Sequence, residues 1–153
     1  MKRVVICGGN RELAELLRRK LGNAASVFSA DVFRHGSADA AVLCDGAETN
    51  VRSPFSCRVL ILPGGASAGP IRADSVITYG WNGKDTVTLS SVGDGKCILA
   101  LQRAVVTTDG TLVESQEISL RTAGFPSGEV LMACSAAMLA LGVPPGALGR
   151  SAQ

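Results

Sequence analysis

The first half of the chain combines short apolar runs with one amphipathic segment. Residues 2–7 are a short run dominated by apolar side chains, and the segment 11–21 carries leucines at positions 13, 16, 17 and 21. Spacings of three and four residues place these leucines on one face of a helix, whereas short continuous apolar runs are typical of buried strands. Further strands are expected at residues 25–29, 40–44 and 58–62. Gly22-Asn23 signals the end of the helix.

In the second half, strands that alternate between apolar and polar positions replace the continuous runs. Strands are expected at residues 75–79, 86–92, 97–107 and 112–120. Gly93-Asp94-Gly95 and Asp109-Gly110 are hairpin signals, so the last three runs are predicted to form an antiparallel meander.

A last helix is predicted after this meander. Ser127 is its expected N-cap, and Gly142 is expected to close it. The side chains expected on its buried face are Val130, Leu131, Cys134 and Met138.

Together these elements predict an α/β fold: a small parallel Rossmann-like sheet followed by an antiparallel β-meander and a C-terminal helix. A chain of 153 residues has the size of one domain, so residues 1–153 are expected to be a single domain. Its α/β sub-layer is assigned to residues 1–70, and the meander with the terminal helix to residues 71–153, because the pattern changes near Pro70.

Composition predicts an aliphatic core and argues against two classes of partner. Hydrophobic residues make up 46% of the chain and aromatic residues only 4%. The 15 basic and 13 acidic residues give a net charge of +2 without a basic stripe, so nucleic acid is not an expected partner. No apolar run is long enough to cross a membrane, and no signal peptide is recognised, so we expect a cytoplasmic protein without a membrane partner.

The five cysteines lie at positions 7, 44, 57, 97 and 134, without CxxC spacing. They are expected to be small buried apolar residues in a reducing compartment, and no spacing of histidines, cysteines and carboxylates predicts a metal site. A catalytic pair of His35, the only histidine, with Cys7 or Cys44 is an alternative, and Cys7 lies beside a helix start that can activate a thiol. A buried strand cysteine and a surface histidine are favoured, so no catalytic residue is predicted.

The order of elements in the second half resembles the end of the central domain of Mur ligases. Residues 76–80 read VITYG, residues 84–92 read KDTVTLSSV, and residues 129–144 read EVLMACSAAMLALGVP. In that family a strand ending in Tyr-Gly leads to a small antiparallel sheet and then to a helix, and here Ala136, Ala137 and residues 141–143 match that helix. The asparagines and the histidine that usually precede the helix are missing. The resemblance covers residues 75–144 and implies a bacterial, cytoplasmic protein related to ligases that use ATP to join an amino acid to a UDP-linked sugar precursor.

The turn after the first strand resembles the phosphate-binding loop of the same family, with its chemistry missing. The family's loop reads like GTNGKTTTAELL, and residues 7–17 read CGGNRELAELL. With AELL at residues 14–17 as the anchor, Asn10 stands at the position of the lysine and Arg11 at that of the magnesium-binding hydroxyl. The chain also has no room for the family's UDP-sugar or C-terminal domains, so the resemblance supports a shared fold more than a shared activity.

Two glycine-containing turns form the candidate ligand site. The backbone N–H groups of a helix start can bind phosphate or carboxylate, which makes Gly8, Gly9, Asn10 and Arg11 candidates. Ligands of open α/β sheets bind at the carboxyl ends of the strands, which adds three residues after strand 58–62. These are Gly64, Gly65 and Ser67. The alternatives are a plain turn capped by Asn10 and a flexible connector between the two halves.

The sequence therefore predicts a non-catalytic protein that binds a nucleotide, a small anion or a protein partner. The missing lysine favours binding over catalysis, because phosphoryl transfer needs positioned positive charge. Two alternatives stay open. One is a small enzyme with a nucleotide cofactor, and the other is a structural subunit of a larger assembly that uses the antiparallel sheet as its interface. A homo-oligomer is also a possible assembly. Trp81 is interpreted as a ligand platform, an interface anchor or a cap over the meander.

Overall fold

The computed structural model describes residues 1–8, 10–30, 36–45 and 54–149. Its main feature is one eight-stranded mixed sheet in the order β10-β7-β6-β5-β4-β3-β1-β2, and a separate two-stranded sheet pairs β8 with β9. The strands are β1 (Lys2–Cys7), β2 (Ala25–Ala30), β3 (Gly36–Leu43), β4 (Phe55–Pro63), β5 (Ile71–Tyr79), β6 (Val87–Gly93), β7 (Lys96–Leu101), β8 (Val105–Val106), β9 (Leu112–Val113) and β10 (Gln116–Arg121). The α-helices are α1 (Arg11–Leu21) and α2 (Gly128–Ala140), and short 3₁₀ turns cover Gly22–Ala24 and Pro145–Ala147. This α/β architecture confirms the predicted fold class.

The parallel part of the sheet is larger than predicted. β5 pairs in parallel with β4 from Phe55↔Ile71 to Pro63↔Tyr79, and a single parallel pair, Tyr79↔Val87, then joins β5 to β6. The boundary predicted near Pro70 is therefore too early, and residues 71–79 belong to the parallel part. The reason is that β5 alternates between buried and more exposed positions along much of its length, so its sequence lacks the continuous apolar signature of a doubly covered parallel strand.

The antiparallel part confirms the predicted meander. β6 and β7 form a hairpin, and β10 pairs with the other side of β7. Asp94 and Gly95 connect β6 to β7 with φ values of +51° and +73°, the left-handed geometry of the favoured two-residue hairpin turn. The long strands predicted at residues 97–107 and 112–120 are each interrupted, and their inner ends form the small β8–β9 ladder around the predicted Asp109-Gly110 turn.

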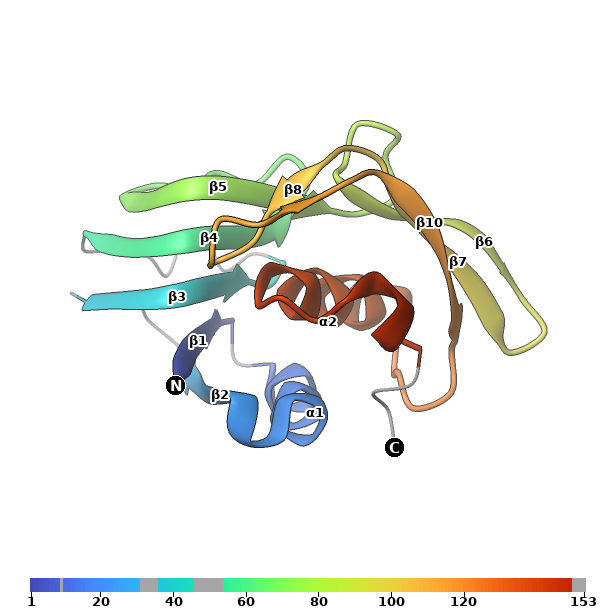
Figure 1. Ribbon diagram of the computed structural model, residues 1–153, viewed down its shortest axis with the longest axis horizontal. Helices are drawn as coiled ribbons and strands as arrows, with labels where there is room; N and C mark the ends of the chain where they lie inside the picture. Colours follow the sequence, from blue (N-terminus) through green and yellow to red (C-terminus); the bar gives the residue numbers. More distant parts are fainter. Residues whose placement is uncertain (9, 31–35, 46–53, 150–153) are drawn as a thin grey trace.

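Both helices begin at the residues predicted to cap them. The Asn10 side chain accepts the N–H of Leu13 at 2.9 Å, and the Ser127 hydroxyl accepts the N–H of Val130 at 3.2 Å. The two helices lie on the same side of the sheet, with α2 in its hollow and α1 beside it (Figure 1).

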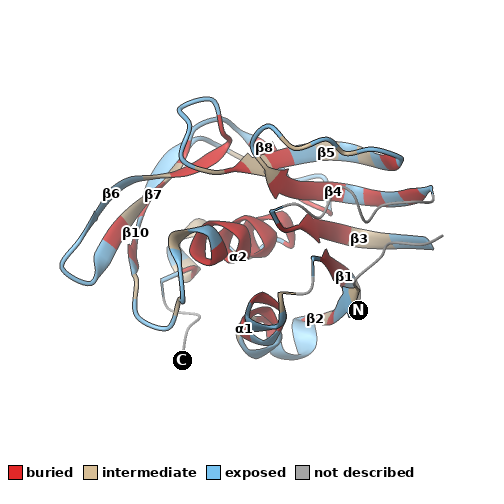
Figure 2. Ribbon diagram, turned by 180° about the vertical axis from the view of Figure 1, so that it is seen from behind, coloured by how far each residue is buried: buried red, intermediate tan, exposed pale blue. Residues whose placement is uncertain are grey.

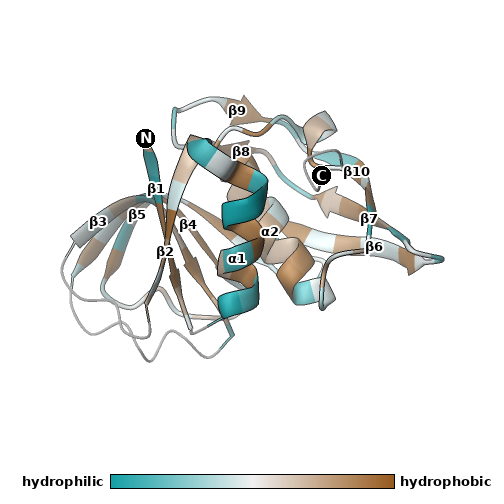
Figure 3. Ribbon diagram, turned by 90° about the horizontal axis from the view of Figure 1, so that it is seen from below, coloured by the Kyte–Doolittle hydropathy of each residue, from teal (hydrophilic) through white to brown (hydrophobic). Residues whose placement is uncertain are grey.

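The burial of α2 differs from the prediction. Every residue of α2 from Val130 to Ala140 is buried, not one face alone (Figure 2). Most residues on its remaining sides are alanine or serine, which are small enough for the sheet and α1 to pack closely around the helix. By contrast, α1 keeps a hydrophilic stripe and is amphipathic (Figure 3).

The sheet separates two hydrophobic clusters. The larger cluster lies between the sheet and the two helices and contains most of the core. The smaller cluster lies on the opposite face of β1, β3, β4 and β5, where Ala66 and Ala68 of the connection from β4 to β5 pack against it. All five cysteines are buried in or beside these clusters, as expected for small apolar residues.

Candidate functional site

A cleft of about 500 Å³ opens where the parallel strands end and both helices begin. Its walls come from the ends of β3, β4 and β5, from the loop after β5, and from the first turns of α1 and α2. The lining residues are Asn10, Leu13, Cys44, Asp45, Pro63, Gly64, Tyr79, Gly80, Trp81, Asn82, Asp85, Ser127, Glu129, Val130 and Ala133. Parallel strands that end at one edge of a sheet create this kind of crevice, which is the usual ligand position in α/β folds.

The cleft brings together only some of the predicted site residues. Asn10 and Gly64 line it, from the two turns that the sequence singled out. The remaining residues of those turns, Gly8, Arg11, Gly65 and Ser67, are not part of its lining, and Gly9 lies outside the described residues.

Several of the predicted residues have local structural roles instead. Gly8 donates its N–H to the Ala30 carbonyl at 3.4 Å, which fixes the turn against β2. Ser67 accepts the N–H of Gly69 at 3.2 Å within its own loop. Asn10 caps α1, so its side-chain oxygen is already engaged although the residue borders the cleft.

The loop from residue 80 to residue 85 contributes more of the cleft than either predicted turn. Gly80, Trp81, Asn82 and Asp85 all line it, and of these only Trp81 had been considered as a ligand contact. One sequence signal could have identified this loop: Tyr79-Gly80 marks the end of a strand. If β5 had been predicted as a parallel strand, its carboxyl end would have placed the following loop at the ligand-binding edge of the sheet.

Asp85 explains why two residues of the cleft are glycines. The side chain is only 5% exposed, and its Oδ2 accepts the N–H of Asn82 at 3.1 Å. A Cβ at Gly80 would stand 2.6 Å from Asp85 Oδ2, and a Cβ at Gly64 would stand 2.8 Å from Asp85 Cγ and overlap Oδ1. Gly64 therefore makes room for a carboxylate of the protein, whereas the sequence predicted it as a residue that binds the ligand.

Trp81 and Glu129 form a hydrogen-bonded pair at the rim of the cleft. The indole Nε1–H donates to Glu129 Oε1 at 2.8 Å, and the ring lies over Gly128, where a Cβ would come within 2.7 Å of it. The indole hydrogen bond, assisted by the backbone of Glu129 and the Ser127 hydroxyl, lowers the pKa of Glu129. Trp81 stays 57% exposed, so the pair holds an aromatic surface at the mouth of the cleft.

Tyr79 and Cys44 border the cleft from buried positions. The Tyr79 hydroxyl donates to the Leu43 carbonyl at 2.9 Å, and burial raises its pKa. Burial, with a smaller contribution from Cys7, raises the pKa of the Cys44 thiol to about 11. Both groups are therefore protonated at neutral pH, where a thiol is a weak nucleophile.

The charge of the cleft is negative. Its lining contains the carboxylates Asp45, Asp85 and Glu129, whereas none of the described residues that line it is lysine or arginine. The helix starts at Asn10 and Ser127 add partial positive charge, but three carboxylates outweigh it. The cleft thus presents hydrogen-bond acceptors to a ligand.

Two further properties concern the described part of the chain. No helix there is long and apolar enough to span a membrane. Among the same residues, no group of three or more histidines, cysteines and carboxylates is arranged to hold a metal ion. Neither the family models nor the curated proteins compared with the chain gave a match.

Proposed function

We propose that the protein is a non-catalytic binding protein and that its site is the cleft at the carboxyl ends of the parallel strands. The observation that carries the proposal is the pairing, in one cleft, of three carboxylates with the exposed indole of Trp81. A ligand that suits this lining has a planar face for the indole and hydrogen-bond donors for the carboxylates. A nucleoside has both features.

The acidic lining narrows the ligand classes expected from the sequence. Carboxylates accept hydrogen bonds from ribose hydroxyls in dinucleotide-binding folds, so they support the nucleoside part of a nucleotide. They repel an unshielded phosphate or carboxylate, so a small anion is the weaker proposal. The neutral Asn10 at the position that resembles the phosphate-loop lysine supports binding without ATP turnover.

We also propose that the protein shares the fold of the Mur ligase central domain but not its activity. The Tyr79-Gly80 end of β5 and the α2 sequence carry that resemblance, and both border the cleft. A bacterial, cytoplasmic binding protein that retains the ligase-like crevice without its phosphate chemistry is consistent with them. The buried cysteines suit a reducing compartment.

A thermal-shift screen tests the proposal. The panel contains adenosine, guanosine, cytidine and uridine, the 5′-monophosphate of each, inorganic phosphate and putrescine. At one hundred times its dissociation constant, a specific ligand adds about 2.7 kcal/mol to the free energy of unfolding. We expect at least one nucleoside to stabilise the protein, its monophosphate to do so less, and inorganic phosphate to have no effect. Stabilisation by phosphate or putrescine, without any nucleoside, would overturn the proposed ligand class.

Matched variants locate the binding. Trp81→Ala and Asp45→Asn remove one aromatic face and one exposed carboxylate from the cleft. Phe28→Ala and Glu114→Gln are the controls: they remove an aromatic ring and a carboxylate from exposed positions outside the cleft. Weaker binding in the first pair only supports the cleft as the site, and equal losses in both pairs contradict it.

A further inference from the structure

The order of the parallel strands creates a switch point between β1 and β3. These strands follow the order β2-β1-β3-β4-β5, so β2 lies on one side of β1 and the later strands lie on the other side (Figure 1). From its carboxyl end the chain leaves β1 toward β2, whereas it leaves β3 toward β4. The two connections diverge and open a crevice at the carboxyl ends of β1 and β3, which is where ligands of open α/β sheets bind.

Asp45 lies directly at this switch point. The N–H of Cys44 donates to the Cys7 carbonyl at 3.0 Å, which joins the carboxyl ends of β1 and β3. Asp45 follows Cys44, is exposed and lines the cleft described above, as Asn10 does from the start of α1. The switch point is therefore part of the proposed ligand site, and Asp45 is the carboxylate found there.

Asp45 differs from the two other carboxylates of the cleft in what its oxygens contact. Asp85 Oδ2 accepts the N–H of Asn82. Glu129 Oε1 accepts the indole N–H of Trp81. Within the part of the chain that the structure describes, the Asp45 carboxylate makes no hydrogen bond or ion pair. An ionised carboxylate only accepts hydrogen bonds, so Asp45 offers two oxygens to the donors of a ligand.

The cleft extends from Asp45 to the indole of Trp81. Asp45 follows β3 and Trp81 follows β5, and β4 lies between these two strands. Because neighbouring strands lie about 4.8 Å apart, the ends of β3 and β5 are about 10 Å apart, a span that suits a nucleoside with its base at one end and its sugar at the other. The Tyr79 hydroxyl lies between the two ends: burial raises its pKa most, and the charges of Asp45 and Glu129 add to this effect.

We propose that Asp45 binds the 2′- and 3′-hydroxyls of a ribose whose base stacks on Trp81, so that the protein selects ribonucleosides over deoxyribonucleosides. This role of Asp45 rests on the proposed function, which places a nucleoside in the cleft. Vicinal hydroxyls give one carboxylate two donors, and hydrogen bonds to a charged acceptor are stronger than those between neutral groups. Carboxylates near strand ends bind ribose hydroxyls in dinucleotide-binding folds. A 2′-deoxynucleoside lacks one of the two donors and should bind about tenfold more weakly.

Isothermal titration calorimetry with matched nucleosides tests the proposal. The probes are adenosine, guanosine, cytidine and uridine, each beside its 2′-deoxy form. The 5′-deoxy form of each is the control, because it lacks a hydroxyl that is not part of the vicinal pair. For the nucleoside that binds most tightly, we expect the 2′-deoxy form to have a dissociation constant about tenfold higher and the 5′-deoxy form to bind like the parent.

Three variants assign the selectivity to a residue. Asp45→Ala removes both acceptors and should make the ribose and 2′-deoxyribose forms bind equally. Trp81→Ala should weaken both forms and keep their ratio, and Glu114→Gln, outside the cleft, should change neither. Equal binding of the two forms by the wild type, or a preference that survives in Asp45→Ala, would overturn the ribose contact and leave nucleoside binding intact. Failure of all the nucleosides to bind would overturn the proposed function together with this role of Asp45.

Discussion

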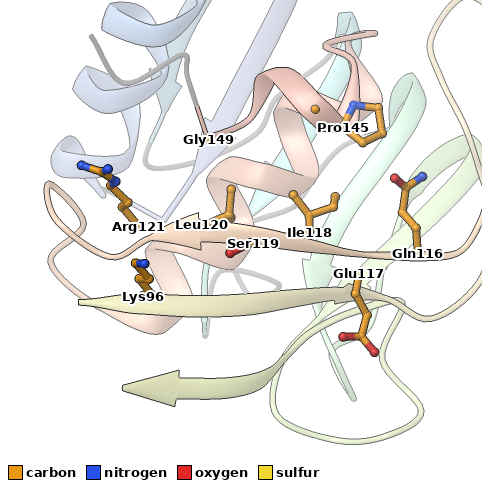
Figure 4. A pocket seen from close by; sticks show the side chains of 10 residues that line it. Lys96, Gln116, Glu117, Ile118, Ser119, Leu120, Arg121, Pro145 and Gly149 are labelled. Atoms are coloured by element: carbon orange, nitrogen blue, oxygen red, sulfur yellow. The ribbon is translucent and has the colours of Figure 1, made fainter. Parts of the chain in front are cut away.

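The parallel and antiparallel parts of this sheet offer two different kinds of surface. At the carboxyl edge of β3, β4 and β5, side chains from several elements converge around a cleft. Along β10, one strand with exposed polar side chains borders a groove whose opposite wall is Pro145, Gly146 and Gly149 (Figure 4). The first surface depends on the packing of residues from many elements, and the second is formed mainly by one strand and the short segment that follows α2. Packing changes should therefore damage the first surface and leave the second intact.

Gly64→Ala should have the largest effect on the parallel part. The added Cβ would overlap the buried Asp85 carboxylate, which must then leave the position it holds at the N–H of Asn82. We expect a loss of about 1–3 kcal/mol in the free energy of unfolding, measured by urea denaturation. Gly83→Ala, in the same loop but with open space at its Cβ, is the control and should be close to neutral. Equal effects of the two substitutions would show that Asp85 does not determine the glycine at position 64.

Asn10→Ala distinguishes a helix cap from an anion site at the first turn. Loss of the hydrogen bond from Leu13 N–H should cost about 1 kcal/mol of unfolding free energy. Arg11→Ala removes an exposed side chain that is not part of the cleft and should change the same quantity by less than about 0.5 kcal/mol. If Arg11→Ala instead abolished binding of a phosphate-containing ligand, the anion site predicted from the sequence would be supported and the cleft proposal weakened.

Glu129→Gln should produce a smaller, pH-dependent effect. The pKa of Glu129 in the folded protein lies below its ordinary value of 4.5, chiefly because the Trp81 indole donates to the ionised form. A carboxylate with a lowered pKa stabilises the fold above its unfolded-state pKa, and this stabilisation is lost as the pH falls through the folded-state value. Because the side chain is largely exposed, we expect about 0.5 kcal/mol at neutral pH.

Urea denaturation of the wild type and of Glu129→Gln, at neutral pH and well below pH 4.5, measures this difference. The gap between the two proteins should close in acid. Glu114→Gln, which removes an exposed carboxylate outside the cleft, is measured beside it as the matched control. A gap for Glu129→Gln that persists unchanged in acid would contradict the role of the Trp81 hydrogen bond.

Local chemistry predicted the elements well. Asn10 and Ser127 cap the helices, and Asp94-Gly95 and Asp109-Gly110 turn the hairpins, because each of these signals acts within a few residues. Strand pairing was harder to predict. Buried and more exposed residues alternate along much of β5, because neighbouring elements cover its two faces unequally. Tertiary packing decides which residues are buried in this way, so the sequence of the strand alone does not reveal its parallel pairing.

The sequence predicted the position of the cleft but only some of its lining residues. Its location follows from parallel strands that end together, so the turns after β1 and β4 were found. Asp85 was missed because its carboxylate is positioned by the two glycines at residues 64 and 80, a contact between separate loops. Glu129 was not predicted as a site residue, since its bond to Trp81 joins residues far apart in the sequence.

The fluorescence of Trp81 tests the central claim most directly. It is the only tryptophan of the chain, and it lies at the rim of the cleft, so its emission reports on this site alone. Titration with the nucleoside that stabilises the protein most should give a saturable change in emission, with a dissociation constant that matches the thermal shift and rises in Asp45→Asn but not in Glu114→Gln. Thermal stabilisation with no change in the emission of Trp81, or saturation by inorganic phosphate alone, would contradict the account of a nucleoside-binding cleft.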